Sequence, residues 1–312
     1  MHRYPRTILA TCCIPWTPTH EVDVPVFRRA IRALVDQGLR DLYIFGTAGE
    51  GYAVDQRRFL QVVDLFVAES ETHDIEPMVG VISLSTATVI ERIDACLARG
   101  VRRFQISLPS WGTLTEAETE TFFRETCGRF PDAQFLHYNL RRSGRLIGAD
   151  EYARLAERHP NLVATKNSGA DVRMLAALFE RAGMLRHFVT EPGYSYGSLL
   201  GECGFLVSIA SVNPALARAY YDAGVRRDGE ALGTLAKELA LMTDALMAAA
   251  DPGLHMDGAF DKVFHKLHDP AFDLHLLPPY RGFSEEAFTA FRQTIIQRFP
   301  NWAAGFGGTA SD

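Results

Sequence analysis

Two side chains that could take part in covalent chemistry stand at the ends of neighbouring apolar runs. Lys166 ends the run 162–166, and Tyr138 lies near the end of the run 134–139. Burial disfavours a charged ammonium and should lower the pKa of Lys166, and a neutral amine can attack a ketone to form an imine. A phenol beside it could move the protons that imine chemistry needs. Each residue also has a plain structural interpretation, Lys166 as a solvent-facing lysine at a loop start and Tyr138 as a core aromatic.

A glycine-rich segment, 46–51, follows another apolar run and could hold an anion. Glycine lets the backbone approach a ligand, and successive N–H groups can bind a carboxylate. The segment lacks the Lys-Ser/Thr ending of a phosphate-binding loop, so it does not predict a nucleotide site. An ordinary tight turn would explain the same glycines. Arg141 and Arg142, just after Tyr138, could hold a carboxylate through paired hydrogen bonds or form a solvated basic pair.

The elements that would position these groups are short apolar runs, each followed by a longer amphipathic stretch. Several runs are apolar throughout, which is typical of strands buried on both faces of a parallel sheet. Eight candidate strands lie at Thr7–Ile14, Leu42–Thr47, Met78–Ser83, Arg103–Leu108, Gln134–Asn139, Leu162–Lys166, His187–Thr190 and Phe205–Ala210.

The stretches between the runs have helical spacing and helix-ending glycines. They lie at Val24–Gln37, Asp55–Ala68, Thr86–Arg99, Glu116–Cys127, Asp150–His159, Val172–Arg181 and Pro214–Ala223. This rhythm predicts an α/β fold, a (β/α)8 TIM barrel. A doubly wound open sheet is the alternative, but its G-x-G-x-x-G marker after the first strand is absent. We expect the barrel to occupy residues 1–225 and a C-terminal helical region to occupy residues 226–312, with helices at Asp228–Ala250, Asp257–His268 and Ser284–Arg298.

The histidines of the C-terminal region raise the question of a metal site. His265 and His268 are three residues apart on an expected helix, with Asp261 one turn earlier and His255 upstream. No fourth ligand is apparent, and we expect the mouth of the barrel to lie elsewhere. We therefore expect a solvated helix face, and we predict neither a metal nor a cofactor.

The overall composition argues for a small-molecule substrate. The net charge is −6 and no Lys/Arg block stands out, so we expect neither nucleic acid nor a membrane as a partner. The run 7–14 is too short to span a membrane, is broken by Pro15 and lacks the cleavage pattern of a signal peptide. Five cysteines without a C-x-x-C pair indicate reduced thiols, so we expect a cytoplasmic protein.

Four segments, in order along the chain, resemble the dihydrodipicolinate synthase / N-acetylneuraminate lyase family of class I, imine-forming aldolases. The segment 46–50 (GTAGE) resembles the family's G-[TS]-T-G-E loop, and 138–144 (YNLRRSG) resembles its Y-N-x-P-x-R-T-G. The segment 164–168 (ATKNS) resembles its lysine motif, and 204–208 (GFLVS) resembles its segment at the eighth strand. The resemblance covers nearly the whole chain.

Carried over residue by residue, the resemblance implies that Lys166 forms the imine and that Tyr138 is the acid/base phenol. Thr47 would act with them and, together with the amide of Ala48, would hold the α-keto carboxylate. The implied activity is that of a Schiff-base-forming lyase, an aldolase or a dehydratase, acting on pyruvate or another 2-keto acid. The family also implies a homo-oligomer, either a dimer or a homotetramer.

The resemblance implies that Arg142 binds the far end of the substrate and that Ser208 lines the keto-acid pocket. The loop after Tyr138 is one residue shorter than in the family and lacks its proline, so Arg141 is the alternative to Arg142. Two departures bear on the reaction. Ala48 removes a hydroxyl from the loop, and Trp111 follows Pro109-Ser110 where the synthase has a tyrosine in P-Y-Y. An indole is a donor only and cannot relay a proton. We therefore predict that the protein is not a strict dihydrodipicolinate synthase.

Trp111 follows the fourth expected strand, which predicts a place at the barrel mouth near Tyr138. There it would narrow the pocket and bind substrate, as in the hydratase-aldolases of aromatic catabolism. Alternatively it packs under the following helix or into a subunit contact. Sugar-acid dehydratases are further neighbours within the family. From another class, a non-catalytic 2-keto-acid-binding or regulatory barrel would share the fold, but Lys166, Tyr138 and Thr47 speak against it.

Overall fold

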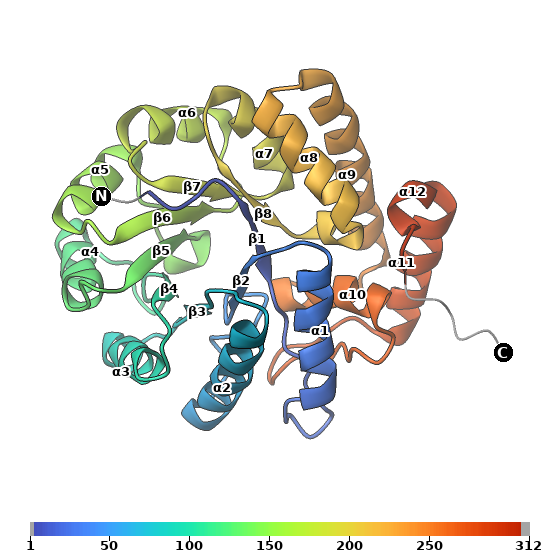
Figure 1. Cartoon of the computed structure of the whole chain (residues 1–312), viewed down its shortest axis with the longest axis horizontal. Coiled ribbons are helices and arrows are strands. Elements are labelled where there is room, and N and C mark those ends of the chain that lie inside the picture. The colour runs from blue at the N-terminus through green and yellow to red at the C-terminus, as the bar shows by residue number, and fades with distance from the viewer. Residues whose placement is uncertain (1–2, 307–312) are drawn as a thin grey trace.

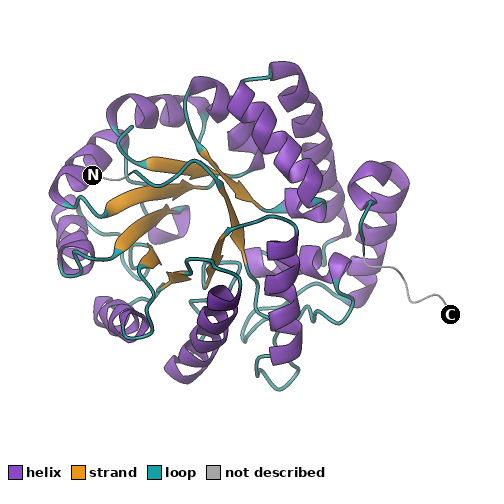
Figure 2. Cartoon of the chain, in the orientation of Figure 1, coloured by secondary structure: helices purple, strands orange, loops and turns teal. Residues whose placement is uncertain are grey.

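Strands and helices alternate around a closed barrel (Figures 1 and 2). The computed structural model describes residues 3–306, and within this range eight parallel strands pair in sequence order, with β1 joined to both β2 and β8. The strands are β1 (Ile8–Thr11), β2 (Asp41–Ile44), β3 (Met78–Gly80), β4 (Arg103–Ile106), β5 (Gln134–Asn139), β6 (Leu162–Asn167), β7 (Arg186–Val189) and β8 (Gly204–Val207). The predicted (β/α)8 barrel is confirmed.

The helices that surround the barrel are α1 (Val24–Asp36), α2 (Gln56–Thr72), α3 (Thr86–Leu97), α4 (Glu116–Phe123), α5 (Ala149–Arg158), α6 (Val172–Arg181), α7 (Glu191–Leu200) and α8 (Pro214–Arg226). Side-chain caps begin many of them. The carboxylates of Asp23, Asp55 and Asp171 each accept a hydrogen bond from a backbone N–H in the first turn. Such caps satisfy N–H groups that have no partner inside a helix, and each typically stabilises the fold by about 1 kcal/mol.

Helix α7 was not predicted. Its sequence, EPGYSYGSLL, contains two glycines and a proline, which lower helix propensity. Pro192 is tolerated because it lies in the first turn, where its missing N–H costs nothing. Gly197 leaves room for a close approach, since a Cβ there would lie 3.0 Å from a Leu175 methyl group. Tertiary packing therefore overrides the weak local preference.

Beyond the barrel the chain forms a helical extension, as expected. Its helices are α9 (Gly229–Ala249), α10 (Asp257–His268), α11 (Glu285–Arg298) and α12 (Pro300–Ala303). Helix α9 packs against α7, α8 and α11, whereas α10 lies beside α1 (Figure 1). The expected boundary between residues 225 and 226 falls in the last turn of α8, and the last six residues of the expected 226–312 region lie outside the described range. The division into two parts stays a prediction.

Glu50, at the end of the glycine-rich loop, joins this loop to the extension. Its carboxylate accepts hydrogen bonds from the Trp16 indole at 2.9 Å and from the Leu277 N–H at 2.6 Å. Lys262 of α10 lies 2.6 Å from the same carboxylate, and both side chains are fully buried. Charges are buried only when they are paired, so this contact fixes α10 over the loop. No helix within residues 3–306 is long and apolar enough to cross a membrane.

Candidate active site

A cavity of about 530 Å³ lies at the carboxyl ends of the strands. Active sites of (β/α)8 barrels lie at this end because the βα loops converge there. Of the residues that the sequence singled out, the cavity is lined by Ala48, Tyr138, Arg141, Arg142, Lys166, Ser208 and Asp261. Side chains from β5, β6, β8 and α10 therefore meet in one space.

Lys166 points into this cavity and is 4% exposed, which excludes the solvent-facing lysine considered above. Tyr138 and Lys166 face each other in the register of β5 and β6, and the Lys166 Nζ lies 3.9 Å from the centre of the Tyr138 ring. The Lys166 Nζ also donates a hydrogen bond of 3.0 Å to the Tyr43 hydroxyl. Two phenols thus contact one amine in a closed space.

The charge state of Lys166 differs from the expectation. Burial does oppose its charge, but the phenol oxygens of Tyr138 and Tyr43 outweigh burial and hold the pKa of Lys166 above its ordinary value. The prediction of a lowered pKa is therefore wrong. An ammonium must lose a proton before it can attack a carbonyl, so the site needs a group that accepts this proton.

The Tyr138 hydroxyl lies 3.1 Å from the Ser168 Oγ, at the start of the loop after β6. The tips of β5 and β6 are held together next to this pair, because the Asn139 amide donates to the Asn167 side chain at 3.1 Å. Sequence reasoning did not assign Ser168 or Tyr43. Ser168 was within reach, as it ends the lysine motif, whereas Tyr43 lies inside an apolar strand and resembles a core residue.

Thr47 and Trp111 line a second cavity, of about 920 Å³, which adjoins the first and shares Leu140 and Arg142 with it. Thr47 is buried, whereas Trp111 is 90% exposed and so does not pack under the helix that follows it. Arg142 donates a hydrogen bond of 3.0 Å to the Asp257 carboxylate, at the border of the two cavities. Thr47 and Trp111 thus lie in the part of the barrel mouth that adjoins the space around Lys166.

An acidic side chain, that of Glu191 at the start of α7, binds the backbone just after β8. The Glu191 carboxylate accepts hydrogen bonds from the N–H groups of Ser208, at 2.7 Å, and Ala210, at 3.0 Å. Burial raises the pKa of Glu191. The Ser208 hydroxyl donates to the Asp261 carboxylate of α10 at 2.9 Å. Ser208 thereby joins the barrel to the helical extension inside the cavity.

The solvated helix face expected around Asp261 is wrong. Asp261 faces the Lys166 cavity, and His265 packs on the Phe272 ring with a centroid distance of 4.9 Å. Burial lowers the pKa of His265 to about 4. Within residues 3–306, no three His, Cys, Asp or Glu side chains are grouped so that they could hold a metal ion. The helix turns inward because its other residues, Lys262 among them, are bound to the barrel loop.

A buried lysine between phenols, at the carboxyl end of a parallel barrel, defines the class of lyases that work through a lysine imine. The sequence profile of the Dihydrodipicolinate synthetase family matches residues 4–254. The chain belongs to this family, and the resemblance drawn from the four motifs is confirmed. Membership of a family of imine-forming lyases favours an enzyme over a non-catalytic binding barrel.

Individual relatives are distant in sequence but similar over their whole length. The 4-hydroxy-tetrahydrodipicolinate synthase of Parasynechococcus marenigrum (strain WH8102) is 26% identical over 293 residues, which cover 92% of this chain and 95% of the relative. A prophage protein of the dihydrodipicolinic acid synthase family from E. coli K12, solved with pyruvate, superposes with a TM-score of 0.81 at 16% identity, covering 94% and 98% of the two chains. The CdNal protein of Clostridium difficile, solved with mannosamine, gives 0.82 at 14% identity, with the same coverage.

Proposed function

We propose that the protein binds pyruvate or another 2-keto acid as an imine on Lys166 and then makes or breaks a bond in the rest of the substrate. The observation that carries this proposal is the buried Lys166 amine, 3.0 Å from the Tyr43 hydroxyl and 3.9 Å from the centre of the Tyr138 ring, in a cavity of about 530 Å³. A relative in fold was solved with pyruvate. The loop at Ala48 lines the same cavity and offers its amide to the substrate carboxylate.

The imine forms when the amine adds to the keto acid and a water molecule is then lost. The neutral amine of Lys166 adds to the keto carbon, the carbonyl oxygen takes up a proton, and the resulting hydroxyl leaves as water after a second protonation. Tyr138, with Ser168 as its hydrogen-bond partner, would then move protons to and from the imine intermediate. Thr47 would support the carboxylate from the adjoining cavity. Arg142, already paired with Asp257, would bind the distal end of the substrate, and Ser208 would line the keto-acid pocket.

Strict dihydrodipicolinate synthase activity is not part of this proposal, although curated relatives at 24–27% identity carry that name. Ala48 has no hydroxyl, and Trp111 is 90% exposed and lines the adjoining cavity. An aromatic distal group, as in a hydratase-aldolase, would have to extend into that cavity to meet Trp111. A sugar-acid substrate would instead meet the carboxylates of Asp257 and Asp261.

Reductive trapping tests the central step. The protein is incubated with pyruvate and borohydride, and the intact mass is measured, with digestion to locate the label. We expect one adduct per chain, on Lys166, and none in Lys166→Ala. An adduct that persists in Lys166→Ala on another lysine would contradict the assignment, and no adduct on the unmodified protein would contradict the proposed function itself.

We also propose that the protein works in the cytoplasm as a homo-oligomer, a dimer or a tetramer, as a member of this family. A solved relative is described as the first monomeric dihydrodipicolinate synthase variant, so oligomers are the rule among those synthases. Light scattering coupled to size exclusion measures the assembly directly, and a monomeric mass at micromolar concentration would contradict this part of the proposal.

A further inference from the structure

Asp261 stands in the wall between two cavities. On one side it lines the Lys166 cavity, and on the other it lines a cavity of about 480 Å³ that lies between α1 and α10. We call this second space the rear cavity. The two spaces share Thr11, Val207, Ser208, Asp261 and Phe264. Asp261 can thus be reached both from the cavity that contains Lys166 and from the rear cavity at the side of the barrel.

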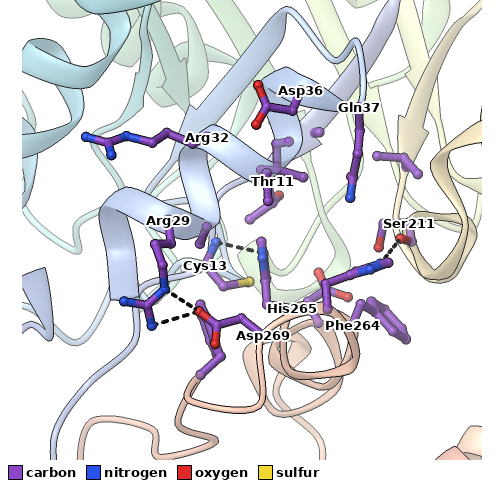
Figure 3. A pocket seen from close by; sticks show the side chains of 18 of the residues that line it. Thr11, Cys13, Arg29, Arg32, Asp36, Gln37, Ser211, Phe264, His265 and Asp269 are labelled. Carbon is purple, nitrogen blue, oxygen red and sulfur yellow. Dashed lines mark hydrogen bonds and ion pairs between the residues drawn. The ribbon is translucent and has the colours of Figure 1, made fainter. Parts of the chain in front are cut away.

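The rear cavity is lined with polar groups (Figure 3). His265 lies at its centre and accepts a hydrogen bond of 3.3 Å from the Cys13 N–H, while Arg29 and Asp269 form an ion pair of 2.9 Å at its edge. A polar cavity of this size holds water. Water in the rear cavity can exchange protons with Asp261 while a substrate fills the barrel mouth.

The surroundings of Asp261 raise the pKa of its carboxyl group to near neutral pH. Burial and the negative charge of Asp257, one turn earlier on α10, raise the pKa of Asp261 to about 7, against the Ser208 hydrogen bond and the charge of Lys166. Glu191 of α7 adds to the rise. Other titratable groups line the two cavities with it, among them Tyr43, Tyr138, Arg141 and Arg142 on the side of Lys166 and Cys13, His265 and His268 in the rear cavity. Burial shifts the pKa values of Cys13 and His265 toward their neutral forms.

We propose that Asp261, a residue of the helical extension, is the proton acceptor and donor for imine formation at Lys166; the inference rests on the proposed function of that lysine. The Asp261 carboxylate takes one proton from the Lys166 ammonium, directly or through a bound water, and leaves the neutral amine. The amine adds to the keto carbon, and one amine proton moves to the former carbonyl oxygen. The Asp261 carboxyl then returns its proton to this hydroxyl, which leaves as water, so that a protonated imine and the original carboxylate remain.

Asp261 can accept the proton that the Lys166 ammonium must lose, which the neighbouring phenols do not readily do. Tyr43 accepts a hydrogen bond from Lys166 but favours the ammonium, and a neutral phenol has no strong tendency to take a proton from it. A general base works best when its pKa lies near the working pH. Ser208 fixes the Asp261 carboxylate by a hydrogen bond of 2.9 Å, so the group is oriented before the substrate arrives.

The test compares the rate of imine formation with pyruvate, measured by borohydride quenching at short times, in the parent protein and in Asp261→Asn. Asparagine keeps the shape and can still accept the Ser208 hydrogen bond, but it cannot titrate. We expect the parent rate to rise with pH through about 7, because the carboxylate is the active form. In Asp261→Asn the rate should fall about 10²-fold or more and show no inflection near pH 7.

Two further arms separate chemistry from folding. Asp261→Ala should regain rate when formate is added, because the rear cavity admits a small carboxylate, whereas Asp261→Asn should not. Asp273→Asn, at an aspartate outside both cavities, serves as the matched control and should keep the parent rate.

A parent rate that is flat across pH 7 would overturn the inference whether or not the variants fold. So would an Asp261→Asn protein that forms the imine at the parent rate. Both results leave the Lys166 adduct, and with it the proposed function, in place. A parent protein that forms no adduct would instead contradict the proposed function.

Discussion

Tyr138 combines two contacts that suit an acid/base group, since its ring faces the Lys166 amine and its hydroxyl lies beside Ser168. Tyr138→Phe keeps the ring and removes only the hydroxyl. We expect turnover to fall by about 10² to 10⁴, the usual cost of losing a general acid/base group, while pyruvate is still trapped on Lys166. Steady-state rates with a cleavable 2-keto acid measure this, and parent-like turnover would make Tyr138 a packing residue.

Tyr43 acts on the charge of Lys166 rather than on the substrate. Tyr43→Phe removes the oxygen that accepts the 3.0 Å hydrogen bond and helps to raise the pKa of Lys166. We expect that pKa to fall, because burial then opposes the charge with less compensation. Competitive labelling of Lys166 with acetic anhydride across pH reports the change. If labelling of Tyr43→Phe reaches half its maximum at the same pH as in the parent protein, Tyr43 does not contribute and Tyr138 alone raises the pKa of Lys166.

The sequence was sufficient to locate Lys166 and Tyr138 at the mouth of the barrel, because side chains at the carboxyl ends of parallel barrel strands converge there. It was insufficient for the charge of Lys166, since that depends on Tyr43, which is 123 residues away along the chain. It did not predict that Trp111 would be 90% exposed beside a cavity that adjoins the one around Lys166, because a residue in a βα loop has no fixed direction.

At the scale of elements, a buried ion pair between the glycine-rich loop and α10 is one link between barrel and extension. Glu50→Gln leaves the Lys262 ammonium buried without a counter-charge. We expect a loss of about 3–5 kcal/mol in the free energy of unfolding, because an unpaired buried charge is costly. Urea denaturation measures this. The double variant Glu50→Gln/Lys262→Met removes both charges and should recover most of the loss; if it is no more stable than the single variant, the ion pair is not the cause.

The same helix should make stability depend on pH through Asp261. Its folded pKa of about 7 lies above the unfolded value near 3.8, so the folded state binds more protons between these limits. Stability contributed by the protonated carboxyl is therefore lost as the pH rises through this window. Asp261→Asn avoids the loss, so its melting temperature should exceed that of the parent protein by more at about pH 8 than at about pH 5. An equal difference at both pH values would contradict the raised pKa.

Local patterns predicted the bounds of α10 but not which of its faces meets the barrel. The spacing of His265, His268 and Asp261 describes one face of α10 correctly, but it cannot tell whether solvent or the barrel lies opposite. The buried ion pair between Lys262 and Glu50, which are 212 positions apart, decides this. Leu277, 227 positions from Glu50, donates a hydrogen bond to the same carboxylate. For the same reason α7 was missed, as its glycines are justified by close packing rather than by propensity.

For the molecule as a whole, we predict weak or absent dihydrodipicolinate synthase activity. Pyruvate and aspartate semialdehyde should give little product, because Ala48 lacks a hydroxyl and Trp111 cannot relay a proton. A coupled assay against a panel of 2-keto-3-deoxy sugar acids and aromatic enals with pyruvate would show which distal group is accepted. Robust turnover with aspartate semialdehyde would mean that the relay is dispensable.

The bond between Glu50 and Lys262 also has a consequence for the order in which the protein becomes competent during synthesis. Translation delivers residues at about 5–20 per second, and the strands that carry Tyr138 and Lys166 leave the ribosome well before α10 does. Until α10 docks, Glu50 has no counter-ion and the wall of the cavity that contains Asp261 is missing. A growing chain can therefore close its barrel around the lysine without yet exposing a finished reactive site to the keto acids of the cell.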